Sequence, residues 1–288
     1  MLVMKRLSAF ILLFAFAFSA YGQTGEERDA AGNGIRSDFL IELAKGDVRD
    51  HIVIHKFGAA NDIGTAWTLV SSSKTYQTPA TAQALEAVST SDSDSTGNAG
   101  LQSVCVDGLG SGWQLLTECV SLRGTQEVNF DSTFFRVFRL YGNSTGTYAN
   151  TAASSQVGTI TIETQGGSDV WGTLAVEASF GFGQSLIGAY TVPRGYKGYV
   201  MHYHVDSEST KIPSIALFRR CNADDLSAPY AGVMRLFNLH RGILGPLEVH
   251  FESPSNGVIG PCDIGFFARV PSNTADISVQ FELLLVKE

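Results

Sequence analysis

The feature that most constrains the fold is a series of short runs in which apolar and polar residues alternate. Examples are "HIVIHKFG" at 51–58, "GTITIETQGG" at 158–167 and "ISVQFELLLV" at 277–286. Alternation with a period of two places successive side chains on opposite faces of a β-strand. Turn-forming residues separate the runs at intervals of about 8–12 residues, which is typical of antiparallel sandwiches and barrels.

The pattern restarts near Gly181 and continues to the C-terminus with seven further strand-like runs. Seven short strands in about a hundred residues make one complete antiparallel sandwich. We therefore predict an all-β chain with two antiparallel, jelly-roll-like β-sandwich domains, at residues 50–180 and 181–288.

Residues 23–49 are predicted to form a flexible lead-in with one short helix. The run "SDFLIELAK" at 37–45 begins with residues that cap helices, and Gly46 follows it. Its apolar residues share one helical face. No second helix is predicted.

Residues 1–22 resemble an export signal. Lys5 and Arg6 precede the apolar run "LSAFILLFAFAFSA", and small residues precede Gln23. This arrangement predicts cleavage before Gln23, after which no stable membrane span remains. A retained N-terminal anchor is the alternative.

The charge balance argues against nucleic acid as a partner. The whole chain has a net charge of −8, and loss of residues 1–22, with two basic residues and no acid, changes it to −10. Phosphate binding requires clustered lysine and arginine, whereas the longest basic run after residue 22 is the Arg219-Arg220 pair.

The four cysteines show no metal-binding spacing. Cys105 and Cys119 flank a predicted hairpin turn at 110–112, so they are candidates for a disulfide if the chain is exported. Cys221 and Cys262 would then be the remaining pair. Four free, half-buried thiols are the alternative.

Histidines provide the weak candidates for a metal site: His202, His204, His240 and His250. The first two lie two residues apart, so they share one strand face. Jelly-roll metal sites also need a carboxylate at a set spacing after the histidine pair, and none follows at that spacing. We therefore predict no metal ion and no other cofactor.

Motifs for catalysis are also missing from the sequence. It contains neither G-x-S-x-G nor H-E-x-x-H. "DSDSTGN" at 92–98 begins like a calcium loop, but Ser103 occupies the position of the bidentate acid, so an ordinary turn is predicted. We predict that the protein is not an enzyme and has no catalytic residues.

The stretch 189–205, "AYTVPRGYKGYVMHYHV", is predicted to be a β-hairpin whose turn is Val192-Pro193-Arg194-Gly195. Its tyrosines, Tyr196, Tyr199 and Tyr203, are predicted to be exposed and to contribute to contacts between copies, because tyrosine is enriched at interfaces. A homo-oligomer is expected, since only 17% of the residues are charged and few charges protect the strand edges.

Several phrases in order carry a resemblance to a known family. They are "ELAKGDVRDHIVIHKFGAANDI", "VSTSDSDSTGNAGLQSVCVDGL", "LTECVSLRGTQEV", "FFRVFRLY", "GQSLIGAYTVPRGYKGYV" and the final "FELLLVK". Over residues 43–288 the chain resembles poorly characterised virion structural proteins of tailed, often marine, bacteriophages. Arg194 and Lys197 depart from that pattern, which has a small residue and threonine there.

The resemblance implies a non-enzymatic protein on the capsid head surface, as a decoration, or in the tail. Its partners would be copies of itself, in a trimer by the habits of virion proteins, and other virion proteins. The signal-like N-terminus favours an alternative: an exported bacterial β-sandwich protein, secreted or on the cell surface, that binds host-surface glycans or acts as an adhesin.

Overall fold

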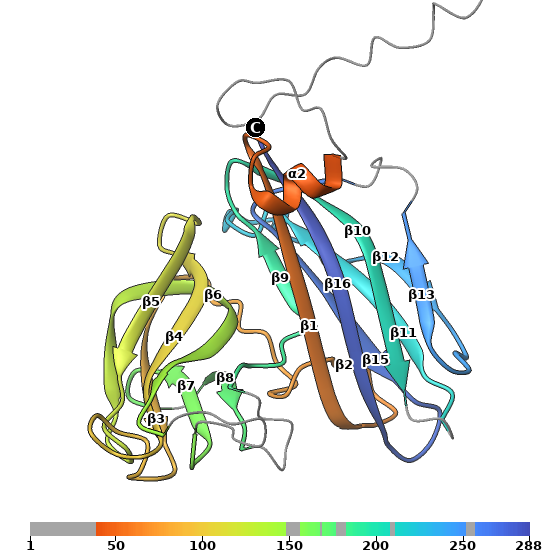
Figure 1. Cartoon of the computed structure of the whole chain (residues 1–288). Helices are drawn as coiled ribbons and strands as arrows, with labels where there is room; N and C mark the ends of the chain where they lie inside the picture. Colours follow the sequence, from red (N-terminus) through yellow and green to blue (C-terminus); the bar gives the residue numbers. More distant parts are fainter. Residues whose placement is uncertain (1–38, 148–155, 168, 177–182, 208–210, 252–256) are drawn as a thin grey trace, which may run out of the picture. The chain divides into compact units, whose positions relative to one another are not determined.

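The computed structural model describes residues 39–147, 156–167, 169–176, 183–207, 211–251 and 257–288. Their regular structure is almost entirely antiparallel β-sheet, with one short helix, as the sequence predicts (Figure 1). The signal-like segment 1–22 and the predicted boundary residue Gly181 lie outside the described residues.

Contacts divide the chain into two units, residues 1–52 and 53–288. The first contains helix α2 (Phe39–Lys45), which ends where the sequence predicts, before Gly46 at φ 80°. Glu42 and Lys45 form an ion pair of 2.8 Å on its surface.

Two five-stranded sheets of the second unit form a sandwich. The first sheet has the order β1-β16-β10-β13, with β14 paired to β10. Its strands are β1 (His51–Ile63), β10 (Tyr196–Ser207), β13 (Leu247–His250), β14 (Val258–Ile259) and β16 (Ala275–Lys287). The second sheet has the order β12-β11-β15-β2, with β9 paired to β15. Its strands are β2 (Thr68–Leu69), β9 (Ala189–Val192), β11 (Ser214–Cys221), β12 (Arg235–His240) and β15 (Cys262–Arg269).

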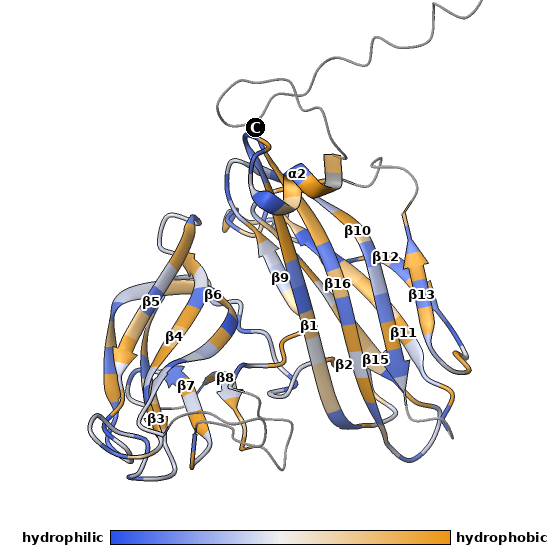
Figure 2. Cartoon of the chain, in the orientation of Figure 1, coloured by the Kyte–Doolittle hydropathy of each residue, from blue (hydrophilic) through white to orange (hydrophobic). Residues whose placement is uncertain are grey.

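Alternate residues of these strands fill the space between the two sheets. Along β10 and β16 the hydropathy alternates (Figure 2), and the apolar positions are the buried ones. Phe266 of β15 has ring contacts with Tyr203 of β10 and Phe281 of β16, with centroids 5.1 and 5.3 Å apart. These aromatic rings join the two sheets across the core.

The third sheet is curled into a half-barrel with the order β5-β4-β6-β3-β7-β8. Its strands are β3 (Gln83–Ser89), β4 (Leu101–Gly110), β5 (Leu115–Ser121), β6 (Val128–Thr145), β7 (Ile160–Thr164) and β8 (Val170–Leu174). The β4–β6 pairing is interrupted by four register shifts. Such bulges increase twist and bend the strands, which accounts for the curl.

The half-barrel and the sandwich share one hydrophobic cluster. Its buried side chains come from β3, β4, β6, β7 and β8, and it continues into Leu69, Ile187, Ala189 and Phe218. Close backbone approach also requires glycine: a Cβ atom at Gly58 of β1 would overlap the backbone of Gly188, before β9.

The strand pairing differs from the predicted division of the chain. β1 and β2 fall within the predicted first domain, yet they pair with β16 and β15 in the C-terminal sandwich. The alternation along a strand shows which residues share a face but not which strand it pairs with. The sequence therefore could not show that residues 51–69 belong to the C-terminal sandwich.

The predicted hairpin around Pro193 is also different. The turn is present, with the Tyr196 amide 3.3 Å from the Pro193 carbonyl oxygen, but β9 belongs to one sheet and β10 to the other. All four residues of β9 are buried. The turn therefore carries the chain between the layers of the sandwich.

Candidate functional site

The strand pairing of β10 with β13 assembles a histidine–carboxylate cluster. His202 is directly opposite His250, and His204 is opposite Glu248. The imidazoles of His202 and His250 stack with centroids 4.6 Å apart. Two of the four histidines predicted as weak metal ligands thus lie together on the outer face of the first sheet.

Glu248 provides the carboxylate of this cluster. Its Oε1 lies 3.3 Å from Nε2 of His202 and 3.0 Å from Nε2 of His250. The hydrogen bond with His250, and then the charge of that imidazole, lower the pKa of Glu248 below its ordinary value. Sequence spacing does not reveal this carboxylate, because the register of two strands brings it to the histidines.

Other titratable groups continue across the same face. Glu282 of β16 is the register partner of His202, and its Oε1 lies 3.7 Å from Nδ1 of His55 on β1. His204 bonds Asp206, two residues further along β10, with its Nε2 atom 2.8 Å from Oδ2 of the aspartate. A row of imidazoles and carboxylates therefore crosses four strands.

His240 does not belong with the other predicted histidines. Its Nε2 bonds the hydroxyl group of Tyr203, which also accepts a hydrogen bond of 3.1 Å from Asn238. This contact lies on the inner side of the sandwich, where burial lowers the pKa of His240 and raises that of Tyr203. The grouping of His240 with His202 is therefore wrong.

The prediction that Tyr203 is an exposed contact residue is also wrong, because Tyr203 is completely buried. A register shift between Val200 and His202 leaves Met201 as an extra residue in β10. This bulge reverses the alternation along the strand. Tyr196 and Tyr199, which precede it, are half-buried.

The segment 226–244 contains a concentration of exposed apolar side chains, which we call the β12 edge patch. It holds seven of the fourteen exposed large hydrophobic residues of the described chain: Leu226, Tyr230, Val233, Met234, Leu236, Leu239 and Leu244. Among the described strands, β12 is the last of its sheet and pairs only with β11. Leu236 and Leu239, opposite Phe218 and Ala216, are 59% and 38% exposed.

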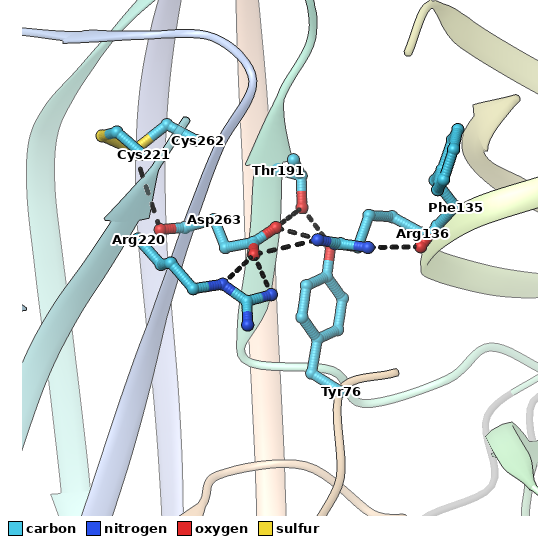
Figure 3. A network of polar contacts seen from close by, with 8 residues as sticks. All are labelled: Tyr76, Phe135, Arg136, Thr191, Arg220, Cys221, Cys262 and Asp263. Atoms are coloured by element: carbon cyan, nitrogen blue, oxygen red, sulfur yellow. Dashed lines mark hydrogen bonds and ion pairs between the residues drawn. A yellow bond between two sulfur atoms is a disulfide. The ribbon is translucent and has the colours of Figure 1, made fainter. Parts of the chain in front are cut away.

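A buried ionic network joins the half-barrel to the sandwich (Figure 3). Arg136 of β6 donates to both carboxylate oxygens of Asp263 on β15, at 2.8 and 3.2 Å. Arg220 of β11 donates to the same carboxylate, as does the hydroxyl group of Thr191, which in turn lies 2.7 Å from the hydroxyl group of Tyr76. Burial opposes ionisation of Asp263, but the two guanidinium groups hold its pKa below the ordinary value.

A buried lysine lies at a second contact between these parts. Lys56 of β1 is 3% exposed, and its Nζ donates to the carbonyl oxygen of Phe138 on β6. Burial, followed by the charge of Arg139, lowers the pKa of Lys56 from 10.5 to about 7. Lys56 borders a cavity of about 410 Å³ that is also lined by Asp107 and Tyr190.

Each disulfide links two neighbouring strands. Cys105 and Cys119 are register partners on β4 and β5, with Cα atoms 4.0 Å apart. Cys221 and Cys262 are register partners on β11 and β15, with Cα atoms 3.9 Å apart. The turn that joins β4 to β5 closes with a bond from the Gly110 amide to the Gln114 carbonyl oxygen.

The "DSDSTGN" segment forms a hydrogen-bonded turn in the structure. The carboxylate of Asp94 is buried and accepts bonds from Ser89, Leu101, Val157 and Gly158. Four donors thus bond the two oxygens of Asp94, and this carboxylate holds the turn against the neighbouring segments.

Comparisons with known proteins do not place the chain in a family. No protein-family model matches it, and no curated protein matches it. A solved structure of the infectious bursal disease virus VP2 subviral particle aligns with 83% of this chain and 73% of its own, with 10% identity and a TM-score of 0.20. A structure of the Gx strain of that virus aligns with 87% of this chain and 81% of its own, with 8% identity and a TM-score of 0.18. Likenesses this weak carry no argument about function.

Within the described residues, no helix has the length and apolar character needed to cross a membrane.

Proposed function

We propose that this protein is a non-enzymatic structural subunit of a tailed-phage virion that assembles through contacts between copies of itself. The observation that carries the proposal is the β12 edge patch. Seven exposed apolar side chains in one segment fit a site of association, because large exposed apolar patches mark such sites. The family phrases over residues 43–288 support the virion as the place of assembly.

A second copy of the chain suits this surface. No described strand pairs with the outer edge of β12, where the Leu239 amide bonds Asn238 Oδ1, so this edge can pair with the same strand of another molecule. In an antiparallel contact of β12 with its copy about a two-fold axis, each chain would present the same strand edge to the other. Such an isologous contact closes as a dimer, whereas no described residue argues for the trimer expected from the family.

Covalent and buried links connect the strands of the second unit. Two disulfides each fasten a pair of neighbouring strands. The Arg136–Asp263 ion pair and the shared hydrophobic cluster fasten the half-barrel to the sandwich. These links favour a rigid body over one that opens and closes around a ligand.

The alternative function, an exported glycan-binding protein or adhesin, is favoured by the signal-like sequence of residues 1–22. All four cysteines form disulfides, which persist in oxidising surroundings. Virion surfaces are also such surroundings, so disulfides are compatible with both proposals.

Fractionation of a lysed culture that carries the gene separates the two functions. We expect the protein to sediment with particles in a density gradient, at a fixed ratio to the major capsid protein by quantitative mass spectrometry. Recovery only from the cell surface or as free protein in the medium would refute the virion proposal and support the exported one.

A further inference from the structure

The outer face of the β1-β16-β10-β13 sheet brings three potential metal ligands to one point. The ligand atoms of His202, Glu248 and His250 all lie within 4.8 Å of one another. Both imidazole Nε2 atoms approach the same carboxylate oxygen, at 3.3 and 3.0 Å. A zinc ion with bonds of about 2.0–2.1 Å in tetrahedral geometry places its ligand atoms roughly 3.3 Å apart, close to the two nitrogen–oxygen distances.

The backbone presents these ligands in a defined geometry. His202 and His250 are directly paired residues of adjacent strands, and Glu248 is two residues from His250 on the same face of β13. Two hydrogen-bonded strands thus hold the ligands, with no loop involved. Glu282 is the register partner of His202 on the other side of β10, and its Oε1 lies 3.7 Å from Nδ1 of His55.

The donor set selects the class of metal. Two imidazole nitrogens and one carboxylate oxygen are typical ligands of zinc and its neighbours in the first transition series, whereas calcium and magnesium prefer oxygen alone. The side chains of Glu248 and His250 are 58% and 66% exposed, so an ion can reach them from solvent and water can fill a fourth position.

We propose that His202, Glu248 and His250 form a binding site for a divalent transition-metal ion such as Zn²⁺, which fastens edge strand β13 to β10. The sequence predicts no metal because no carboxylate follows the histidine pair at the expected spacing. The structure provides the carboxylate from a different strand. The site is independent of the proposed role in a virion.

The test is calorimetric titration of ZnCl₂ into the full chain after removal of any affinity tag and treatment with a chelator. We expect one ion per chain, and at least tenfold weaker binding in His250→Ala and in His202→Ala. The matched control is His204→Ala, since His204 lies two residues along β10 on the same face but bonds Asp206. This variant should bind zinc like the wild type.

Cobalt gives a second readout that reports coordination directly. Co²⁺ added to the wild type should produce visible absorption bands of a four-coordinate site, which Glu248→Gln should shift or abolish. Circular dichroism of each variant establishes that the fold is retained. Absence of saturable binding in the wild type, or an equal loss of affinity in His204→Ala and His250→Ala, would overturn the proposal.

Discussion

Arg136 and Asp263 are 127 residues apart in the sequence and form a two-point ion pair in which both side chains are at least 98% buried. The guanidinium group also lies 4.9 Å from the ring of Trp113. An isolated charge would be costly at such a site, so the pair is stable only while both partners are present. The half-barrel and the sandwich are therefore coupled by a contact that tolerates little change.

Replacement of Arg136 by methionine should lower the free energy of unfolding by about 3 kcal/mol, because Asp263 loses two hydrogen bonds and half of its compensating charge. Urea denaturation followed by tryptophan fluorescence measures the change. The control is Arg194→Met, which removes an ion pair of 2.6 Å with Asp224 in which the Arg194 side chain is 51% exposed. Exposed pairs contribute under about 1 kcal/mol, so an equal loss in the two variants would contradict the assigned role of Arg136.

Lys56 should make stability depend on pH between about 7 and 10.5. In this interval the unfolded chain binds a proton at Lys56 that the folded chain does not, so stability rises with pH, by at most about 1.4 kcal/mol per unit. Below pH 7 both states are protonated and the cost of the buried charge is fully present. Urea denaturation from pH 6.5 to 9 should show the rise in the wild type and a smaller rise in Lys56→Met.

The matched control for this prediction is Lys287→Met, since Lys287 is exposed at the end of β16. It should leave the slope of stability against pH unchanged. A slope in Lys56→Met equal to that of the wild type would show that Lys56 keeps its charge in the folded protein.

Local features of the fold could be predicted from the sequence, because they depend on residues near one another in the chain. Helix α2 lies within the predicted 37–45, and Cys105 and Cys119 face each other in the hairpin expected for them. The all-β class follows in the same way from alternation and turn residues.

Long-range pairing and register could not be predicted. β1 pairs with β16 at the other end of the chain, which no local pattern specifies. One extra residue, Met201, reverses which tyrosines of β10 are buried, and the register of β10 with β13 alone brings Glu248 to the histidines. The burial of the tyrosines and the position of Glu248 both depend on register. A shift of one residue would turn the other set of side chains to each face of the strand.

The two disulfides should differ in their contribution to stability. They close loops of 14 and 41 residues, for which the chain-entropy treatment gives about 3 and 4 kcal/mol. We expect the double variant Cys221→Ala, Cys262→Ala to unfold at a lower urea concentration than Cys105→Ala, Cys119→Ala. The reverse order would indicate that packing around β4 and β5, rather than loop length, determines the contribution.

The β12 edge patch should mediate association between copies. Leu236 is 59% exposed on the outer face of the edge strand, so an aspartate there should not disturb the core but would have to be desolvated in a contact. Light scattering should show the wild type shifting from monomer toward dimer as the protein concentration rises. Leu236→Asp should raise the concentration at which half of the chains are dimeric at least tenfold. Leu115→Asp is the control, because Leu115 is 42% exposed at the edge of the half-barrel on β5. Equal weakening in both variants would point to general aggregation, and a wild type that stays monomeric at high micromolar concentration would remove the main structural support for self-assembly.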